Sequence, residues 1–258
     1  MTTPQVRCAY ADTPAGQIHY RVLEEGADSN AAPLLLLHPA PRSSLYFKRV
    51  LPLLRGMRAI APDLPGFGGS YPLPAGATMN TLAGGIVDCL DALGVEKAHV
   101  FGIHSGNKVG AALAAGWPER VRSFMFAGMT HSIIPDAARR NEAVRAYVAA
   151  KPALDPQEDP EFFRDMQLDR LQCEAAYAAL YEANYAFDLQ NALQRVQAPS
   201  LVIELCVPPE EHLGRQATPI CAMMRNATAV SFPFNDKDLL WRQPATLIPA
   251  LRGFVQGH

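Results

Sequence analysis

The sequence predicts an α/β protein in which a mainly parallel sheet carries helices on both faces and a helical segment is inserted. Continuously apolar runs, of the kind that form strands buried on both faces, alternate with segments of helical spacing in the first half of the chain. The alternation stops between about residues 132 and 196, where only helical patterns occur, and then resumes. Such a sheet needs helices on each face to bury it.

The predicted elements follow in order. VRCAYAD and QIHYRVLEE show partial alternation and predict an antiparallel hairpin. PLLLLHP predicts a buried strand, and SSLYFKRVLPLL predicts a helix after it. MRAIAPDLP repeats the strand pattern, and the amphipathic helix MNTLAGGIVDCLDALGV follows and ends at Gly94. The alternation then continues through KAHVFGIH, SGNKVGAALAAGWPERV and VRSFMFAGMTH.

The inserted helical segment separates the predicted core domain into two parts along the chain. IIPDAARRNEAVRAYVAAK, DPEFFRDMQLDRL and CEAAYAALYEANYAFDLQNALQRV all have helical patterns and are separated by breaks. SLVIEL and ATAVSFP then resume strand character, and PATLIPALRGFVQG closes as a helix. We therefore expect a core domain of residues 1–131 and 197–258 and a helical cap of residues 132–196.

Composition limits the classes of partner. Of 258 residues, 49% are hydrophobic and 19% are charged, and the net charge of −2 provides no basic field for nucleic acid or an anionic membrane. The five cysteines are scattered and include no C-x-x-C, which favours a reducing compartment. There is no signal-peptide pattern and no run of about 18 apolar residues. We expect a cytoplasmic protein with a small-molecule ligand and no cofactor or metal, and we leave open a homodimer.

Four stretches carry a resemblance to a known family. LLLLHPAP, IAPDLPGFGGS, HVFGIHSGNKVGAALAAGWPERV and RQPATLIPALRGF resemble the small capped members of the α/β-hydrolase fold superfamily, over nearly the whole chain apart from the cap. The resemblance implies an eight-stranded, mainly parallel sheet. It also implies that the first stretch holds the oxyanion-hole loop and the third holds the nucleophile elbow, a sharp strand-to-helix turn.

The spacing of the elbow motif places a histidine at its centre. The family pattern is G-x-nucleophile-x-G, and His104 lies midway between Gly102 and Gly106. If Ser105 were the nucleophile, Ile103 would hold a glycine position, where a β-branched side chain is poorly suited. Histidine is enriched at positive φ among non-glycine residues, so it is compatible with the turn. We expect Ser105 to begin the following helix.

The remaining triad positions also depart from the family pattern. Counting along ELCVPPEEH puts Pro208 where the family has its acid, and residues 205–209 contain no carboxylate. Counting back from Pro244 puts Lys237 where the family has its histidine, and no histidine occurs between His212 and His258. The resemblance therefore implies a degenerate triad.

Three histidines fall at the carboxyl ends of predicted strands, where open α/β sheets bind ligands. They are His38, His104 and His131, and Glu204 is expected near the same rim. His38 has a structural alternative, His131 has the alternative of simply beginning the cap, and Glu204 has the alternative of pairing with a cation or a backbone N–H. A three-histidine metal site is a further alternative, but no local ligand spacing such as H-x-x-x-H supports it.

The candidate chemistry is a reaction at a carbonyl group. We expect an enzyme acting on a small ester, lactone or other carbonyl compound, with His104 as general base or nucleophile and the backbone N–H groups of Ser105 and Ala40 as the oxyanion hole. His131 and Glu204 are candidates for orienting His104, and His38 and Lys237 for the binding site. The alternatives are a cofactor-free lyase, a non-catalytic ligand-binding protein and an unorthodox serine hydrolase that uses Ser105. The cap aromatics are candidate lining residues or packing residues: Phe162, Phe163, Tyr177, Tyr181 and Tyr185.

Overall fold

The computed structural model describes residues 5–28, 30–128, 142, 159–205, 217–232 and 239–258. The strands are β1 (Arg7–Thr13), β2 (Gly16–Leu23), β3 (Leu34–Leu37), β4 (Ala59–Pro62), β5 (Ala98–Ile103), β6 (Val121–Ala127), β7 (Ser200–Leu205) and β8 (Ala227–Phe232). The α-helices are α1 (Met79–Ala92), α2 (Ser105–Gly116), α4 (Pro160–Ala186), α5 (Leu189–Arg195), α6 (Ala217–Met223), α7 (Leu239–Arg242) and α8 (Ile248–Gln256). Short 3-10 helices are η1 (Ser44–Phe47), η2 (Leu51–Leu54), η3 (Pro118–Arg120) and η5 (Pro244–Thr246).

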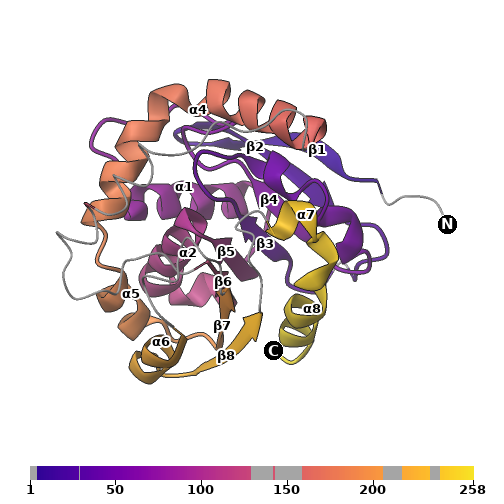
Figure 1. Cartoon of the computed structure of the whole chain (residues 1–258), viewed down its shortest axis with the longest axis vertical. Helices are drawn as coiled ribbons and strands as arrows, with labels where there is room; N and C mark the ends of the chain where they lie inside the picture. The colour runs from indigo at the N-terminus through magenta and orange to yellow at the C-terminus, as the bar shows by residue number, and fades with distance from the viewer. Residues whose placement is uncertain (1–4, 29, 129–141, 143–158, 206–216, 233–238) are drawn as a thin grey trace.

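The strands form one eight-stranded sheet in the order β1-β2-β4-β3-β5-β6-β7-β8 (Figure 1). β2 pairs antiparallel with β1 and β4, as expected for the entry hairpin, and the pairs from β4 to β8 are parallel. This arrangement confirms the mainly parallel eight-stranded sheet. It brings the carboxyl ends of β3, β5, β6 and β7 to one edge in that order.

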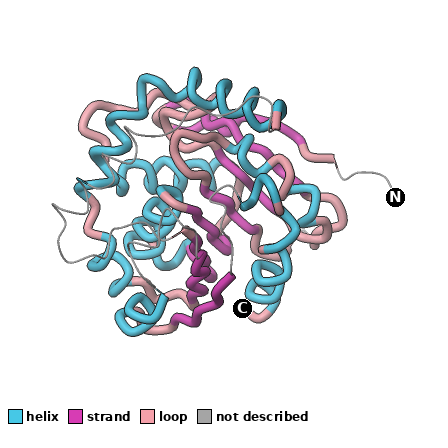
Figure 2. Tube along the Cα trace, in the orientation of Figure 1, coloured by secondary structure: helices cyan, strands magenta, loops and turns pink. Residues whose placement is uncertain are grey.

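Alternate residues of the central strands enter two separate cores. Leu35 and Leu37 pack into one core with side chains of α1, α2, α5 and α6, whereas Leu34 and Leu36 pack into the other with η1, η2, α7 and α8. Figures 1 and 2 show these two groups of helices on opposite sides of the sheet. Helices cover both faces of the sheet, which confirms the prediction. Successive side chains of a strand point to opposite faces, so each group of helices buries one face of these strands.

The segment after β3 differs from its prediction. SSLYFKRVLPLL forms two 3-10 helices, η1 and η2, instead of one helix. Pro52 lies at the start of η2 and has no N–H to donate to an upstream carbonyl, so a continuous α-helix is interrupted there. α1 follows its prediction: Thr78 and Thr81 form a capping box at its start, and Gly94 lies just beyond its end with a φ of +63°.

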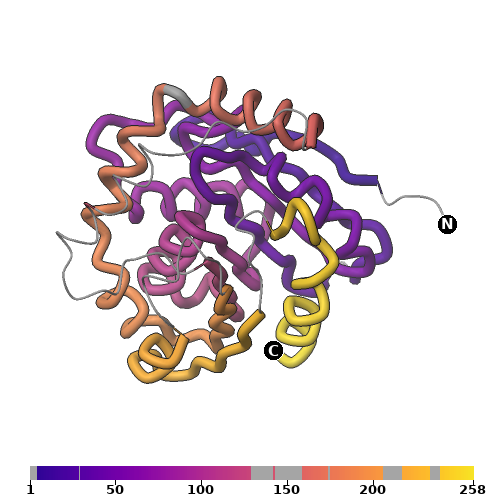
Figure 3. The backbone as a smooth tube through the Cα atoms, in the orientation of Figure 1, coloured from indigo at the N-terminus to yellow at the C-terminus, as the bar shows by residue number. Residues whose placement is uncertain are grey.

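In the described part of the inserted segment, the break between two helices falls at residues 187–188 instead of near residue 172. α4 runs without a break through residues 171–173, and α5 follows after Phe187 and Asp188. Figure 3 shows α4 lying along the outer edge of the molecule before the chain turns into α5. The predicted helix at 133–151 lies outside the described residues. The separate cap domain of residues 132–196 stays a prediction.

α4 docks on the core through a row of acidic residues. Asp169 pairs with Arg42, Asp165 pairs with Lys48, and Glu161 accepts from Arg49 at 2.5 Å. Residues 161, 165 and 169 are four apart, so they lie on one face of the helix. The basic partners all come from the segment between β3 and η2, so this segment determines where α4 lies.

Among the described helices, none is both long enough and apolar enough to cross a membrane.

His99 provides a test of pH-dependent stability. It lies in β5, is 4% exposed and hydrogen-bonds to the buried Ser123 hydroxyl at 2.8 Å. Burial, with contributions from Arg122 and His258, lowers the pKa of His99 to about 4. We expect the free energy of unfolding to fall as the pH drops from about 6.5 toward 4, because the unfolded chain binds a proton there and folded His99 does not.

Urea unfolding at about pH 7, 6 and 5 measures this slope. His99→Gln removes the titrating group and is expected to make the stability less dependent on pH over that interval. A variant with the slope of the unsubstituted protein would contradict the assignment to His99.

Candidate active site

β5 and α2 meet at His104. Its backbone has φ 50° and ψ −119°, and among the described residues it is the only non-glycine with a positive φ. The His104 N–H still donates to the Ala127 carbonyl at 3.1 Å, and the His104 carbonyl accepts from Asn107 N–H at 3.1 Å. The turn is therefore tied to β6 on one side and to α2 on the other. A residue held in such a conformation costs on the order of 1–3 kcal/mol, and this kind of strain is found at functional sites.

Two glycines make the turn sterically feasible. A Cβ on Gly102 would lie 2.5 Å from the Gly106 carbonyl oxygen, and a Cβ on Gly106 would lie 2.2 Å from the Leu37 carbonyl oxygen. Both contacts are with backbone atoms, which have little freedom to move away. The structure thus places His104, and not Ser105, midway between the two positions that exclude a side chain.

The His104 ring packs against Gly128, which follows β6. A Cβ on Gly128 would lie 2.5 Å from both Cε1 and Nδ1 of the imidazole, and Gly128 itself has a φ of +61°. His104 is half-buried, so part of it faces solvent. Sequence reasoning missed Gly128, although a glycine directly after a buried strand was a signal that could have indicated it.

Gly128→Ala is expected to displace the His104 imidazole and to lower any activity that depends on it by about tenfold or more. Gly94→Ala is the matched control, because Gly94 has a similar φ of +63° but a Cβ added to it would have no atom within 4 Å. Both variants carry the backbone strain, and only the first affects the ring. Equal turnover by the two variants would contradict a role for this packing.

Ser105 begins α2, and its hydroxyl accepts a hydrogen bond from a backbone N–H of the neighbouring loop. The Ala40 N–H donates to Ser105 Oγ at 2.6 Å, and Ser105 is 8% exposed. The sequence-based expectation leaves the Ala40 N–H to face a substrate oxygen. The loop after β3 and the start of α2 thus lie side by side, and the serine side chain accepts the bond.

His38 fixes the conformation of the same loop through hydrogen bonds to main-chain atoms. Its Nδ1 donates to the Pro39 carbonyl at 3.1 Å, and its Nε2 accepts from Leu64 N–H at 2.9 Å, so both ring nitrogens are bonded to main chain. The ring is fully buried, and this burial lowers the pKa of His38, so it is neutral near pH 7. This is the geometry of a positioning residue, the structural alternative considered for His38.

Asp63 connects the loops that surround His38. Its carboxylate bonds to His19 Nδ1 at 2.8 Å and accepts from the N–H groups of Ser44 at 2.6 Å and Gly69 at 2.9 Å. Burial raises the pKa of Asp63, but these bonds, that with His19 first, outweigh it and lower the pKa below its usual value. Asp63 therefore stays ionised and fixes the loops after β3 and β4.

Glu204 lies near the carboxyl end of β7. Its carboxylate accepts from the Ala217 N–H at 3.1 Å and from the Ser231 hydroxyl at 3.0 Å, so it links β7 to α6 and β8. Pairing with a backbone N–H was the structural alternative for this residue. The other positions considered from the sequence lie outside the described residues: His131, Pro208, His212 and Lys237.

Lys108 connects the elbow helix to α4. It lies four residues after His104, is buried, and donates from Nζ to the Asn184 carbonyl at 3.1 Å. Asn184 belongs to the last turn of α4, whose carbonyls lack partners within the helix and favour a cation. The end of the long helix is thereby held close to the strained turn.

The cap aromatics occupy two environments. Phe162 is buried beside Trp241, with ring centroids 5.3 Å apart, and therefore packs α4 against the core. Tyr177, Tyr181 and Tyr185 form a row along α4, with successive centroids 4.7 and 5.9 Å apart. Within the described part of the chain, no group of three or more His, Cys, Asp or Glu residues is arranged to hold a metal ion.

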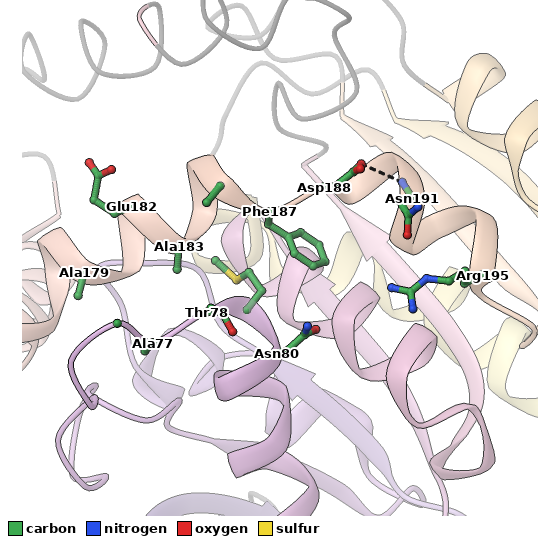
Figure 4. A pocket seen from close by; sticks show the side chains of 13 residues that line it. Ala77, Thr78, Asn80, Ala179, Glu182, Ala183, Phe187, Asp188, Asn191 and Arg195 are labelled. Carbon is green, nitrogen blue, oxygen red and sulfur yellow. Dashed lines mark hydrogen bonds between the residues drawn. The ribbon is translucent and has the colours of Figure 1, made fainter.

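A cavity of about 660 Å³ lies away from His104. It is formed by the start of α1, the second half of α4, and α5. In Figure 4 the Phe187 ring points into it, Asn80 and Arg195 lie along it, and Asp188 caps α5 through the Asn191 N–H. None of its lining residues belongs to the strained turn or to the loop after β3, so we do not place the chemistry there.

Comparisons with known proteins find hydrolases among the similar sequences. The chain is 39% identical over 107 residues to an uncharacterized hydrolase of Saccharomyces cerevisiae (41% of this chain, 36% of that protein). It is 36% identical over 107 residues to 2-hydroxymuconate semialdehyde hydrolase of a Pseudomonas species (39% of this chain, 38% of that protein). These alignments span little more than a third of the curated relatives.

Solved structures show the same fold over nearly the whole chain. The enol-lactonase of Burkholderia xenovorans superposes with a TM-score of 0.74 at 18% identity, covering 96% of this chain and all of the other. The family model described as the alpha/beta hydrolase fold matches residues 32–203, which include the loop after β3, the strained turn and most of β7. The chain therefore belongs to the α/β-hydrolase fold family.

Proposed function

We propose that this protein is a cofactor-independent enzyme that hydrolyses a small ester, lactone or related carbonyl compound with His104 as general base. The observation that carries the proposal is the strained backbone of His104. This conformation holds a half-buried imidazole at the carboxyl edge of the sheet, where such folds bind ligands. A histidine side chain is the group that most often serves as a general base in enzymes.

The proposed reaction needs no second side chain as nucleophile. His104 takes a proton from a water molecule while the water oxygen attacks the substrate carbonyl carbon, and the carbonyl oxygen becomes an oxyanion. The Ser105 N–H, in the first turn of α2, has no partner within the helix and is available to this oxyanion. The imidazolium then returns its proton to the departing alkoxide as the carbon–oxygen bond breaks.

The Ala40 N–H supplies the second oxyanion donor in this proposal. Because it donates to Ser105 Oγ in the structure, the Ser105 hydroxyl has to rotate away when a substrate oxygen arrives. The hydroxyl then acts as a stand-in for the oxyanion in the ligand-free protein. The relatives named as a semialdehyde hydrolase and an enol-lactonase support hydrolysis of a small carbonyl compound as the reaction class.

One observation favours a second candidate, a non-catalytic ligand-binding protein. A backbone donor occupied by the chain's own hydroxyl is what a silent site would also show. The serine-hydrolase alternative has less support, because Ser105 lies within the regular turn of α2 and its Oγ already accepts a hydrogen bond.

The test is a panel of p-nitrophenyl esters and lactones, assayed with the unsubstituted protein and with Ser105→Ala, together with exposure to a fluorophosphonate. We expect turnover by both proteins and no adduct on Ser105. A stoichiometric Ser105 adduct with an inactive Ser105→Ala variant would establish the serine mechanism instead. No turnover across the panel would favour the binding protein.

A further inference from the structure

Arg42 has hydrogen-bonding groups that the described structure does not use. It follows Ala40 of the oxyanion-hole loop by two residues and is only 3% exposed. Its Nε donates to Asp169 Oδ2 at 2.7 Å, but Nη1 and Nη2 are buried and have no partner among the described residues. A guanidinium carries four N–H groups on those two nitrogens, and leaving buried donors unpaired is costly, so an acceptor is expected at this edge.

The surroundings of Arg42 hold the guanidinium in a defined orientation. The rings of Tyr46 and Phe162 lie near it, with centroids 5.0 and 5.2 Å from Cζ. Ser43 Oγ also donates to Asp169, at 2.5 Å, which fixes the carboxylate that holds Nε. The unused Nη1 and Nη2 edge is therefore preorganised, as a specificity group in a binding site needs to be.

Arg42 belongs to the same loop as Ala40, whose N–H is a proposed oxyanion donor. Consecutive residues of its loop contact the two elements that enclose the site: the Ala40 N–H contacts Ser105, the Pro41 carbonyl accepts from Cys173 of α4 at 3.6 Å, and Arg42 contacts Asp169 of α4. Ala40 and Arg42 are two residues apart, so their Cα atoms lie within about 7 Å of each other.

Local charge indicates which acceptor fits. Asp169 already balances the charge of Arg42. The carboxylate of Asp63 is also buried nearby, since the charges of Asp63, Asp169 and Arg42 all contribute to the pKa of His38. A substrate carboxylate would add another negative charge to a buried region that already holds two. An uncharged oxygen would accept the N–H groups without that cost.

We propose that the Nη1 and Nη2 edge of Arg42 binds an uncharged carbonyl oxygen of the substrate, distinct from the carbonyl that reacts. Arg42 is then a specificity-determining residue, and the preferred substrates are esters or lactones that carry a second, neutral carbonyl group. This inference rests on the proposed hydrolytic function.

The experiment compares two esters of equal chain length, p-nitrophenyl 4-oxopentanoate and p-nitrophenyl pentanoate. We expect kcat/KM to favour the oxo ester by about 10- to 100-fold, the range for a hydrogen bond to a charged donor. p-Nitrophenyl hydrogen succinate, which has a carboxylate at the same end, is expected to be the poorer substrate. Preference for the succinate, or equal kcat/KM for the first two esters, would overturn the proposal.

Arg42→Lys keeps the charge opposite Asp169 but lacks the paired planar N–H groups. We expect it to bring the ratio of kcat/KM between the oxo ester and the pentanoate close to one. Arg49→Lys is the matched control, since Arg49 also docks α4, through Glu161, and stacks on Trp241 with its centroid 4.1 Å away. If Arg42 has only a structural role, the ratio of kcat/KM between the oxo ester and the pentanoate is the same in Arg42→Lys and Arg49→Lys. That result would contradict a binding role for Arg42.

A readout without turnover separates this inference from the proposed function. Saturation-transfer NMR with methyl 4-oxopentanoate and methyl pentanoate measures binding to the unsubstituted protein and both variants. If no ester is hydrolysed but the oxo compound binds selectively and Arg42→Lys removes that selectivity, the hydrolytic function fails and the Arg42 site stands. If esters are hydrolysed without selectivity for the oxo group, the Arg42 site fails and the hydrolytic function stands.

Discussion

His104→Ala is expected to lower kcat for ester hydrolysis by about 10²- to 10⁴-fold, the usual contribution of a general base. The melting temperature is expected to stay within about 3 °C, because His104 is half-buried and alanine removes few core contacts. Steady-state kinetics and thermal unfolding on the same preparations measure the two effects.

Two further variants separate chemistry from backbone strain at this position. His104→Gly relieves the positive φ of 50°, so we expect it to be more stable than His104→Ala while remaining inactive. Added imidazole is expected to restore part of the activity of the glycine variant, because a free base can enter the space that the ring leaves. A fully active His104→Ala protein would show that the reaction does not depend on this side chain.

Gly106→Ala is expected to have the largest effect on stability, a loss of about 2–4 kcal/mol, because the new Cβ cannot be accommodated without moving backbone. That Cβ would lie 2.2 Å from the Leu37 carbonyl oxygen and 2.7 Å from the His38 carbonyl oxygen. Displacing these atoms would separate the loop after β3 from α2 and break the Ala40 to Ser105 hydrogen bond. Urea unfolding measures the loss.

The control for this substitution lies on the same helix. A Cβ on Gly116, the last residue of α2, would have no atom within 4 Å, so Gly116→Ala is expected to leave stability unchanged or to raise it by about 0.5 kcal/mol. Similar losses in both variants would mean that α2 tolerates no alanine for a general reason, and not that Gly106 is needed for close approach.

Much of the fold follows from local patterns in the sequence. PLLLLHP and KAHVFGIH are short apolar runs typical of a strand buried on both faces, and the structure has strands β3 and β5 there. The prediction for the segment after β3 was wrong in type because the apolar spacing of η1 and η2 is the same for an α-helix and a 3-10 pair, and Pro52 decides between them. The break that was predicted near residue 172 is absent, because α4 runs from Pro160 to Ala186.

The candidate site divides in the same way. The family pattern G-x-nucleophile-x-G, matched by Gly102 and Gly106, placed His104 at their midpoint, and the structure shows that close backbone approach excludes a side chain at both glycines. The packing of the imidazole on Gly128, the occupation of the Ala40 N–H by Ser105 and the ion pair between Arg42 and Asp169 could not be predicted.

Local patterns were sufficient for the order of strands and helices along the chain, because this order depends on periodicity within a few residues. The resemblance to the family motif was sufficient for the residue at the centre of the strained turn. Long-range contacts were needed to learn which polar groups are used up and which remain available. His38 has both nitrogens bonded to main chain, whereas Arg42 has two nitrogens without partners in the described structure. The partners come from residues up to 127 positions away, and contacts at that separation leave no local pattern in the chain.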